Sequence, residues 1–495
     1  NYKRERERER EMGVHVLLVP WSAQGHLTPV LQLARVLACN PEFLITLVLN
    51  ARASARVESA SSALPRHHSI KVQVICDGLN PDPSHTPSMD DVVASVPIMQ
   101  QNLQTLVGDL MASPHPVTCL ISGTFCYWSK SVARAFNIPR VELWSSPAFI
   151  YSIGFFHHRL IEEGLVPLKG QRSNTWITGI PGLPPMKATE FVKELTPTEE
   201  EIQADPEKVP RMLKRLQNTY SEARDQYRIL VNSIYDLESQ SFDALCEEQV
   251  HAYAVGPLFL HNVGVDASNQ RFTEPRTSLY KEDRSCLQWL GSRAPASTLY
   301  VAFGSDSRME KQDIQELALG LEASGHNFLW AIRPGSIVGD LSVADVLPEG
   351  FEERVANRGL IVSWAPQTDV LSHSAIGGFL SHCGWNSTLE ALWMGVPILG
   401  WPQRADQGVN QFFIREVWKV GLAVEMDEDS KVSRISIEKA VRLLMVGEEG
   451  SLAREKVKEV KKLMLKVTND GGSSRRNLDQ FIQDLYHLAQ DRCST

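Results

Sequence analysis

Short apolar runs alternate with segments of helical periodicity along the first half of the chain. Runs of strand length occupy residues 14–19, 44–49, 71–75, 117–122 and 139–144. Apolar residues recur at helical spacing over residues 30–38, 91–111 and 128–136. Near-continuous apolar strands that alternate with helices are typical of a parallel sheet covered by helices. The pattern predicts a doubly wound α/β domain, with a turn over residues 21–28 and Pro29 in the first turn of the next helix.

The alternation restarts after a stretch near the middle of the chain. Residues 261–280 are polar and have no periodicity, which is typical of a linker. Beyond them, the pattern predicts strands within residues 297–305, 327–333, 359–364, 377–381, 397–401 and 421–426. We expect two α/β domains, over residues 12–258 and 281–472, joined by a linker over residues 259–280. Ligands of such sheets bind outside the carboxyl ends of the strands, so we expect the site in the cleft between the domains.

Composition narrows the class of protein. Of the 495 residues, 43% are hydrophobic and 22% are charged, which is typical of a globular chain. The net charge of −9 disfavours a nucleic-acid partner. No uncharged apolar run reaches the ~20 residues that span a bilayer, and neither end resembles a signal peptide or an anchor. The eight cysteines form no C-x-x-C pair, which favours reduced thiols over zinc or redox sites. We expect a cytoplasmic monomer.

Residues 364–407 form the most informative segment, WAPQTDVLSHSAIGGFLSHCGWNSTLEALWMGVPILGWPQRADQ. The chain has no G-x-G-x-x-G, P-loop or G-x-S-x-G motif, but this segment is dense in Trp, His, Gly and Asn. GGFLS predicts a strand, HCG a tight turn, and WNSTLEALWMG a helix that begins near Asn386 and Ser387. Backbone N–H groups and the positive helix dipole there would suit a phosphate. Asn and Ser are also good helix caps, so the residues alone leave both interpretations open.

The same segment resembles the signature box of the plant family 1 UDP-glycosyltransferases. The similarity runs from WAPQ through SHCGWNSTLE to ADQ, and it extends to PWSAQGHLTP, CLISGTF, IPGLPP, LVNSIYDLE, YAVGPL, CLQWL, LYVAFGS and GGSSRRNLDQFI. The resemblance implies a GT-B fold, in which two Rossmann-like domains face each other across a cleft. It assigns the acceptor mainly to the first domain and the nucleotide sugar mainly to the second. It also implies a terminal helix, over residues 473–495, that packs back on the first domain.

Matched residue by residue, the box implies a site for the nucleotide of a UDP-sugar. Trp364 would stack on the uracil ring, and the backbone of Ala365 would form a hydrogen bond with the edge of the ring. Gln367 would reach the ribose region. Glu390 would accept hydrogen bonds from both ribose hydroxyls, since a carboxylate suits a vicinal diol.

The rest of the box implies contacts to the diphosphate and the sugar. Gly384 would allow close approach of the backbone, and the diphosphate contacts would come from Ser305, His382, Asn386 and Ser387. Asp406 and Gln407 would bind the sugar hydroxyls, with Trp385 close by. In the family, Gln at the last position of the box goes with glucose and His with galactose, so Gln407 implies UDP-glucose as co-substrate.

The resemblance implies no metal and no further cofactor, because a helix dipole and side chains stabilise the UDP leaving group. The chain does contain a D-x-D sequence at Asp427, Glu428 and Asp429, a pattern that some glycosyltransferases use to hold a metal on a diphosphate. It lies in a polar, acidic turn after a predicted strand, and we interpret it as a solvated turn.

His26 is the predicted catalytic residue. An acceptor hydroxyl is a poor nucleophile until its proton is removed, and a histidine with a pKa near the working pH suits a general base. A histidine after a strand is often only a hydrogen-bonded turn residue, but QGH-x-x-P matches the family and implies the catalytic role. The family inverts the anomeric centre in a single displacement, which implies a β-glycoside as product.

Gly123 is the main departure from the family pattern. The family carries Asp at this position, where the carboxylate orients and charges the catalytic histidine. Three explanations stay open: an engineered exchange, a natural enzyme that works with His26 alone, or another orienting group such as Thr124 or a water. The alternative function is a catalytically impaired protein that binds UDP-sugar or a hydrophobic ligand.

The acceptor is expected to be a small lipophilic phenol, flavonoid or terpenoid. Candidates for an apolar acceptor pocket are Phe125, Trp144, Phe149, Tyr151 and Phe155, and each could equally belong to the core. Gln403 and Arg404 replace an aromatic or apolar pair that the family usually has before ADQ. We interpret Arg404 as facing solvent, with the acceptor as the alternative.

Overall fold

The computed structural model describes residues 13–59, 68–80, 89–261, 280–339, 341–427 and 431–493. The charged N-terminal segment, most of the predicted linker, and Glu428 and Asp429 of the D-x-D sequence lie outside the described residues. The chain divides into two compact units, each made of separate stretches of sequence. The first comprises Asn1–Ser152, Lys214–Tyr280 and Val467–Thr495, and the second comprises Ile153–Leu213 and Lys281–Lys466.

The first unit is built on a seven-stranded parallel sheet with the order β3-β2-β1-β4-β5-β8-β9. Its strands are β1 (Val14–Val19), β2 (Phe43–Asn50), β3 (Ile70–Ile75), β4 (Cys119–Gly123), β5 (Arg140–Trp144), β8 (Arg228–Val231) and β9 (Ala252–Ala254). Its helices are α2 (Gln24–Ala38), α3 (Ala51–Ser59), α4 (Met89–Met111), α5 (Ser129–Ala135), α10 (Tyr235–Glu247) and α20 (Ser473–Cys493). The strand order reverses between β1 and β4, which is where doubly wound sheets bind ligands.

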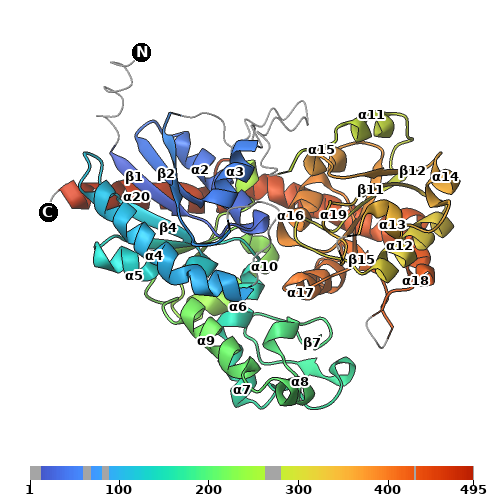
Figure 1. The fold of residues 1–495 in the computed structure, drawn as a ribbon, viewed down its shortest axis with the longest axis horizontal. Helices are drawn as coiled ribbons and strands as arrows, with labels where there is room; N and C mark the ends of the chain where they lie inside the picture. The colour runs from blue at the N-terminus through green and yellow to red at the C-terminus, as the bar shows by residue number, and fades with distance from the viewer. Residues whose placement is uncertain are drawn as a thin grey trace. The chain divides into compact units, whose positions relative to one another are not determined.

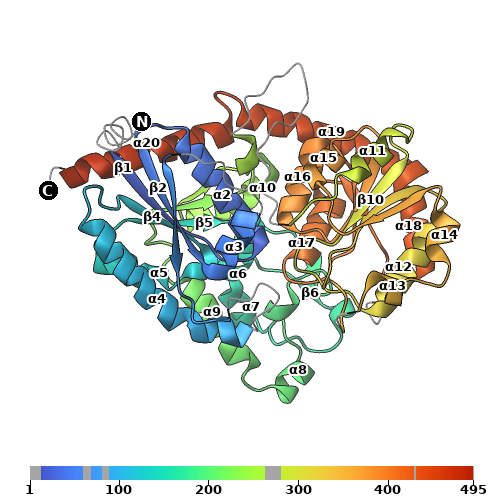
Figure 2. The same cartoon turned by 45° about the horizontal axis from the view of Figure 1, so that its top comes forward.

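Two apolar cores cover the two faces of this sheet. Side chains alternate along β1, so Val16 and Leu18 join the core under α2 and α20, whereas Leu17 and Val19 join the core under α4 and α5. The helix α20 contributes Leu478, Phe481, Leu485 and Ala489 to the first core. Figure 2 shows α20 on one side of the strands and α4 and α5 on the other.

The second unit is built on a six-stranded parallel sheet with the order β12-β11-β10-β13-β14-β15. Its strands are β10 (Thr298–Ala302), β11 (Asn327–Ala331), β12 (Gly359–Val362), β13 (Ile376–Ser381), β14 (Ile398–Gly400) and β15 (Gly421–Ala423). Its helices include α11 (Ser285–Gly291), α12 (Lys311–Ser324), α13 (Val343–Val346), α14 (Phe351–Val355), α15 (Gln367–Leu371), α16 (Trp385–Met394), α17 (Gln407–Phe412), α18 (Arg434–Val446) and α19 (Glu448–Thr468). Figure 1 shows α12 and α18 side by side. The strand order reverses between β10 and β13.

Residues 153–213 belong to the second unit, whereas the sequence pattern grouped them with the first domain. They form α7 (His157–Glu162), the hairpin of β6 (Trp176–Ile177) and β7 (Met186–Lys187), and α8 (Glu199–Ala204). Two contacts explain the grouping. Glu190 forms an ion pair with Arg415 at 2.5 Å, and Gly408 lies so close to the Glu190 carbonyl that an added Cβ would approach its oxygen to 2.7 Å. The helices α6 (Ala148–Phe155) and α9 (Lys208–Tyr220) cross the two boundaries of this segment.

The doubly wound parallel sheets predicted from the sequence are confirmed, but the start of α2 is not where the pattern placed it. The helix begins at Gln24, because the N–H groups of His26 and Leu27 both donate to the carbonyl of Ala23. His26 is therefore in the first turn of a helix, and Pro29 lies inside it. Among the described residues, no helix combines the length and the apolar character needed to cross a bilayer.

Candidate functional site

In the second unit, the turn between β13 and α16 is shaped around His382. The imidazole is wedged between two glycines: a Cβ added at Gly304 would lie 2.5 Å from Nε2, and one added at Gly384 would lie 2.3 Å from it. Cys383, which lies between His382 and Gly384 in the sequence, has a φ of +62°, a conformation that L-residues rarely adopt. Burial lowers the pKa of His382 to about 4, so the ring is neutral at pH 7. Strained, glycine-lined backbone of this kind is typical of a ligand site.

The start of α16 distinguishes the two interpretations of Asn386 and Ser387. The N-cap of the helix is Gly384, and no side-chain cap hydrogen bond forms at this described helix start. Asn386 and Ser387 lie in the first turn instead, so they do not act as the N-cap. The structure therefore does not support the interpretation of Asn386 and Ser387 as helix caps. The backbone N–H groups of this first turn lie at the helix N-terminus, where an anion is favoured.

Gln367, Ser387 and Glu390 are joined by hydrogen bonds. The amide nitrogen of Gln367 donates to Ser387 Oγ at 2.9 Å and to Glu390 Oε2 at 2.7 Å. Burial raises the pKa of Glu390 to about 7, and the bond from Gln367 opposes this shift. Trp364 and Ala365 lie just before α15, where the carbonyl of Trp364 accepts a hydrogen bond from Asp283 N–H at 2.7 Å. Six of the predicted nucleotide and diphosphate residues therefore lie on α15, α16 and the segment before α15.

Asp406 lies directly before α17, and Gln407 is the first residue of that helix. The side-chain oxygen of Gln407, Oε1, accepts hydrogen bonds from the backbone N–H groups of Gln403 and Arg404, at 2.8 and 3.0 Å. Only the side-chain nitrogen of Gln407 is then left to form hydrogen bonds with a sugar. Asp406 accepts a bond from Asn410 Nδ2 at 3.2 Å, and the same amide group donates to the carbonyl of Cys383 at 2.9 Å. Asn410, which the motif comparison did not single out, thus ties the loop before α17 to the turn at His382.

Trp385, Ser305 and Arg404 complete the predicted set in the second unit. Trp385 is buried and packs against Trp418, with ring centroids 6.1 Å apart. Ser305 follows β10 and is half-buried. Arg404 forms an ion pair with Asp306, which also follows β10, and both side chains are largely exposed. Arg404 is thus exposed to solvent, as expected, and its ion pair links the loops after β10 and β14.

In the first unit, His26 lies in the first turn of α2, which follows β1, whereas Gly123 ends β4 and Ser145 directly follows the neighbouring strand β5. His26 Nδ1 lies 2.6 Å from Ser145 Oγ, and the ring packs edge-on against Phe125 with centroids 5.0 Å apart. Trp21 also packs edge-on against Phe125, with ring centroids 6.1 Å apart. Burial lowers the pKa of His26 to about 4. The ring is thus neutral at pH 7 and able to accept a proton.

Gly123 ends β4 with an extended backbone, at φ −61° and ψ 150°, which any residue can adopt. An added Cβ would meet nothing closer than the backbone nitrogen of Trp21, at 3.4 Å. The site therefore has room for a side chain at this position. Thr124, proposed from the sequence as a possible orienting group, forms no hydrogen bond with His26, because its buried hydroxyl oxygen has no partner among the described residues.

The five candidate acceptor residues separate into two classes. Trp144, Phe149 and Tyr151 are buried in the first unit, where Trp144 and Tyr151 pack edge to face at 5.0 Å, so the core interpretation is favoured for these three. Phe125 is 37% exposed beside His26. Phe155 is half-buried and belongs to the second unit, packed on Phe156.

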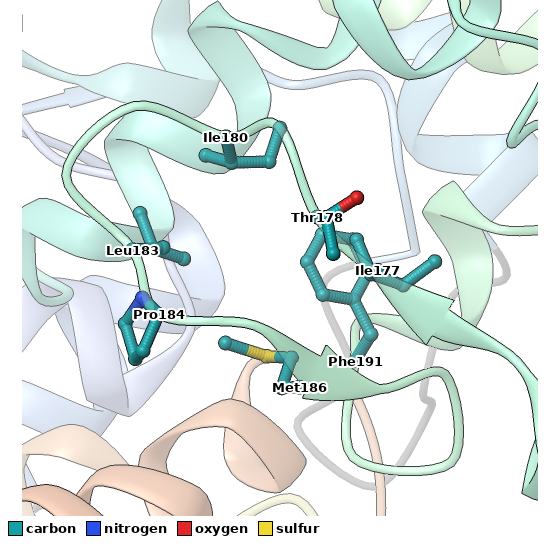
Figure 3. Close-up of a pocket in the computed structure, with 7 residues that line it drawn as sticks. All are labelled: Ile177, Thr178, Ile180, Leu183, Pro184, Met186 and Phe191. Carbon is teal, nitrogen blue, oxygen red and sulfur yellow. The ribbon is translucent and has the colours of Figure 1, made fainter.

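A small hollow lies in the second unit around the IPGLPP loop. Figure 3 shows the seven residues that line it: Ile177, Thr178, Ile180, Leu183, Pro184, Met186 and Phe191. Its empty volume of about 170 Å³ includes open solvent. Ligand pockets usually enclose roughly 300–1,000 Å³, so this hollow is too small to hold an acceptor of the expected size.

Comparison with known proteins identifies the family. The profile described as "UDP-glucoronosyl and UDP-glucosyl transferase" matches residues 275–453. The chain is 34% identical to 7-deoxyloganetin glucosyltransferase of Catharanthus roseus, over 95% of this chain and 96% of the relative. It is also 34% identical to (R)-mandelonitrile beta-glucosyltransferase of Prunus dulcis, over 96% and 98% of the two chains. The chain belongs to the plant family 1 UDP-glycosyltransferases.

Solved structures of plant UDP-glycosyltransferases share the fold. Phytolacca americana UGT2, complexed with UDP-2fluoro-glucose and pterostilbene, matches with a TM-score of 0.78 at 30% identity, over 95% of this chain and 99% of that one. TcCGT1 in complex with UDP matches with a TM-score of 0.79 at 26% identity, over 96% and 99%. The GT-B fold expected from the sequence is confirmed, and this UDP-glycosyltransferase is an enzyme that uses a UDP-sugar.

The sequence motifs did not single out three residues that contact predicted site residues of this UDP-glycosyltransferase: Trp21, Ser145 and Asn410. Trp21 and Ser145 carry a usable signal, because each lies within two residues of the carboxyl end of a predicted strand. Asn410 lies inside a helix, and only the folded loop shows its two bonds. Among the described residues, no group of three or more His, Cys, Asp or Glu side chains is placed to hold a metal ion.

Proposed function

We propose that this UDP-glycosyltransferase transfers glucose from UDP-glucose to a hydroxyl of a small lipophilic acceptor, with inversion of the anomeric centre and with His26 as general base. The observation that carries the proposal is the state of His26: a neutral ring, bonded through Nδ1 to Ser145, beside the exposed ring of Phe125. The named substrates of the relatives, 7-deoxyloganetin and mandelonitrile, support a lipophilic hydroxyl compound.

Donor binding is assigned to the second unit. Glu390 and Gln367 would bind the ribose, with uracil on Trp364 and the backbone of Ala365. The first turn of α16, His382 and Ser305 would bind the diphosphate, where the helix dipole favours negative charge. Asp406 and the amide nitrogen of Gln407 would bind the sugar hydroxyls. The hydrogen bonds among Gln367, Ser387 and Glu390 support this role, because they hold two ligand-binding groups in place before the ligand arrives.

The reaction is a single displacement. His26 Nε2 takes the proton of the acceptor hydroxyl while the oxygen forms a bond to the anomeric carbon. The bond between that carbon and the β-phosphate oxygen breaks, and UDP leaves with the electron pair. Because the His26 pKa is about 4, the ring is a weak base, so acidic phenols should react faster than aliphatic alcohols. The rings of Trp21 and Phe125 would hold a flat acceptor beside the base.

The decisive experiment incubates the enzyme with UDP-[¹⁴C]glucose and a panel of simple phenols, flavonoids and terpenoid alcohols. Labelled glycoside that disappears in His26→Ala supports the proposal. Release of UDP without labelled product on any acceptor class would overturn it.

Gly123 favours a second candidate function, a protein that binds UDP-sugar or a hydrophobic ligand without turnover. The position has space for a Cβ, and the chain has no carboxylate there. Calorimetry that shows UDP binding, in a protein with no turnover on the full acceptor panel, would select this function instead.

A further inference from the structure

Ser145 is the polar group that contacts the predicted base. It directly follows β5, is only 8% exposed, and places Oγ 2.6 Å from His26 Nδ1. The turn that carries it is fixed at both ends. The indole N–H of Trp144 donates to the carbonyl of Pro147 at 2.8 Å, and the carbonyl of Trp144 accepts from Asn232 N–H at 2.9 Å. The hydroxyl is therefore held in a defined position and is not free to move with a flexible loop.

The other neighbours of the ring cannot supply this contact. Gly123 has no side chain, and Phe125 presents an apolar ring. Thr124 follows Gly123, but its buried hydroxyl oxygen has no hydrogen-bond partner among the described residues, so it does not hold the ring of His26.

We propose that Ser145 is a positioning residue, whose hydroxyl oxygen accepts a hydrogen bond from Nδ1–H of His26 and so keeps Nε2 unprotonated and available to the acceptor hydroxyl. The inference rests on the proposed function of His26 as general base. A neutral imidazole carries its proton on one nitrogen only, and the partner of that nitrogen sets the tautomer. In this chain a serine takes over the orienting role of the family's carboxylate, without its negative charge.

The charge difference separates this arrangement from a carboxylate–histidine pair. A hydroxyl can fix the ring and its tautomer, but it stabilises the imidazolium less than a carboxylate does. Ser145 can therefore orient the ring without adding a charge, and burial keeps the histidine a weak base.

The kinetic test compares Ser145→Ala with Ser145→Thr, which keeps a hydroxyl, and with Ser146→Ala, a control at the next position. With an aliphatic alcohol as acceptor, Ser145→Ala should lower kcat by at least about tenfold, which is part of the roughly 10²–10⁴-fold that general-base catalysis contributes. KM for UDP-glucose should change by less than about twofold. Ser145→Thr should recover most of the rate, and Ser146→Ala should behave as wild type.

Two further variants give the test its specificity. In the His26→Ala background, Ser145→Ala should have no additional effect, because the hydroxyl acts only through the ring. Adding Gly123→Asp to Ser145→Ala should restore activity, since a carboxylate can accept the same Nδ1 proton. An independent loss in the His26→Ala background, or a loss confined to KM for UDP-glucose, would overturn the proposal and make Ser145 a substrate contact.

A measurement without turnover separates this inference from the proposed function. Histidine labelled with ¹³C at Cε1 gives a resonance for His26, assigned by its loss in His26→Ala. If Ser145 accepts from Nδ1–H, it stabilises the imidazolium, so Ser145→Ala should lower the His26 pKa further and change its tautomer signature. A pKa that rises in Ser145→Ala would mean that the hydroxyl donates to Nδ1, which would overturn the inference even in an active enzyme.

Discussion

Glycines near the predicted site differ in the space that surrounds them. Gly304 and Gly384 have none, because a methyl group at either position would collide with the ring of His382. Gly123 has enough, since its nearest neighbour lies 3.4 Å from an added Cβ. Packing therefore requires glycine at positions 304 and 384, whereas packing does not require it at position 123.

Gly123→Asp should create a carboxylate–histidine pair. The charge should raise the His26 pKa above its present value of about 4, so the acid limb of the kcat/KM profile should move to higher pH. On weakly acidic alcohols the rate should increase by about ten- to a thousandfold, on the order of 1.4–4 kcal/mol. Gly123→Asn is the uncharged control. Unchanged rates on both alcohols and acidic phenols would show that the missing carboxylate does not limit this enzyme.

Glu390 should make nucleotide binding depend on pH. Its pKa is about 7 because it is buried, and ribose hydroxyls should bind its charged form more tightly. Binding below pH 7 then requires the loss of a proton, so affinity should fall by up to about tenfold per pH unit below 7. Calorimetry with uridine, which has no phosphate to titrate, measures this directly. A Kd that is constant between pH 6 and 8, or identical in Glu390→Gln, would contradict the role.

Gln407→His should shift donor preference toward UDP-galactose. Histidine presents different groups to the sugar, but it also removes the oxygen that accepts the N–H groups of Gln403 and Arg404. Absolute rates should therefore fall with both donors, and the ratio of the two kcat/KM values is the informative quantity. A change in that ratio below about twofold, roughly 0.4 kcal/mol, would mean that Gln407 does not distinguish the donors.

At the scale of elements, the sequence predicts the strands better than the ends of the helices. Strands β1, β2, β4 and β10 are continuous apolar runs, and burial on both faces leaves few other structures for such runs. The start of α2 was missed because it depends on two bonds to one backbone carbonyl, that of Ala23, and Ala23 carries no capping side chain. Likewise, the residue types of the signature box identify the donor residues, but Ser145 enters the site only through the sheet order β1-β4-β5.

Helix α20 should contribute strongly to the stability of the first unit. Phe481 is fully buried in its core, and Asp484 of the same helix forms an ion pair with Arg228 at 3.1 Å. Phe481→Ala should lower the free energy of unfolding of this unit by about 3–5 kcal/mol. Gln483→Ala, at an exposed position of α20, is the matched control and should cost less than about 0.5 kcal/mol. Equal effects of both variants in denaturant titrations would show that α20 is not part of this core.

At the scale of the whole molecule, the division into two compact units predicts that UDP binding stabilises one unit more than the other. Ligand binding stabilises only the state that binds, by about 2.7 kcal/mol at 100 times Kd. Because the predicted nucleotide residues all lie in the second unit, UDP should raise the midpoint of one calorimetric transition and leave the other near its original temperature. A single transition that moves as a whole would show that the two units unfold together.

The order in which the chain leaves the ribosome adds a constraint on its biogenesis. Synthesis proceeds from the N-terminus, and domains generally fold as they emerge. The seven-stranded sheet, however, needs Leu478, Phe481 and Leu485, which are made after the entire six-stranded unit. The apolar face that α20 covers therefore stays exposed while residues 281–466 are translated, and during that time it can bind chaperones or aggregate. Fragments that stop before residue 473 should leave that apolar face exposed, so a fragment expressed to study the first unit should include α20.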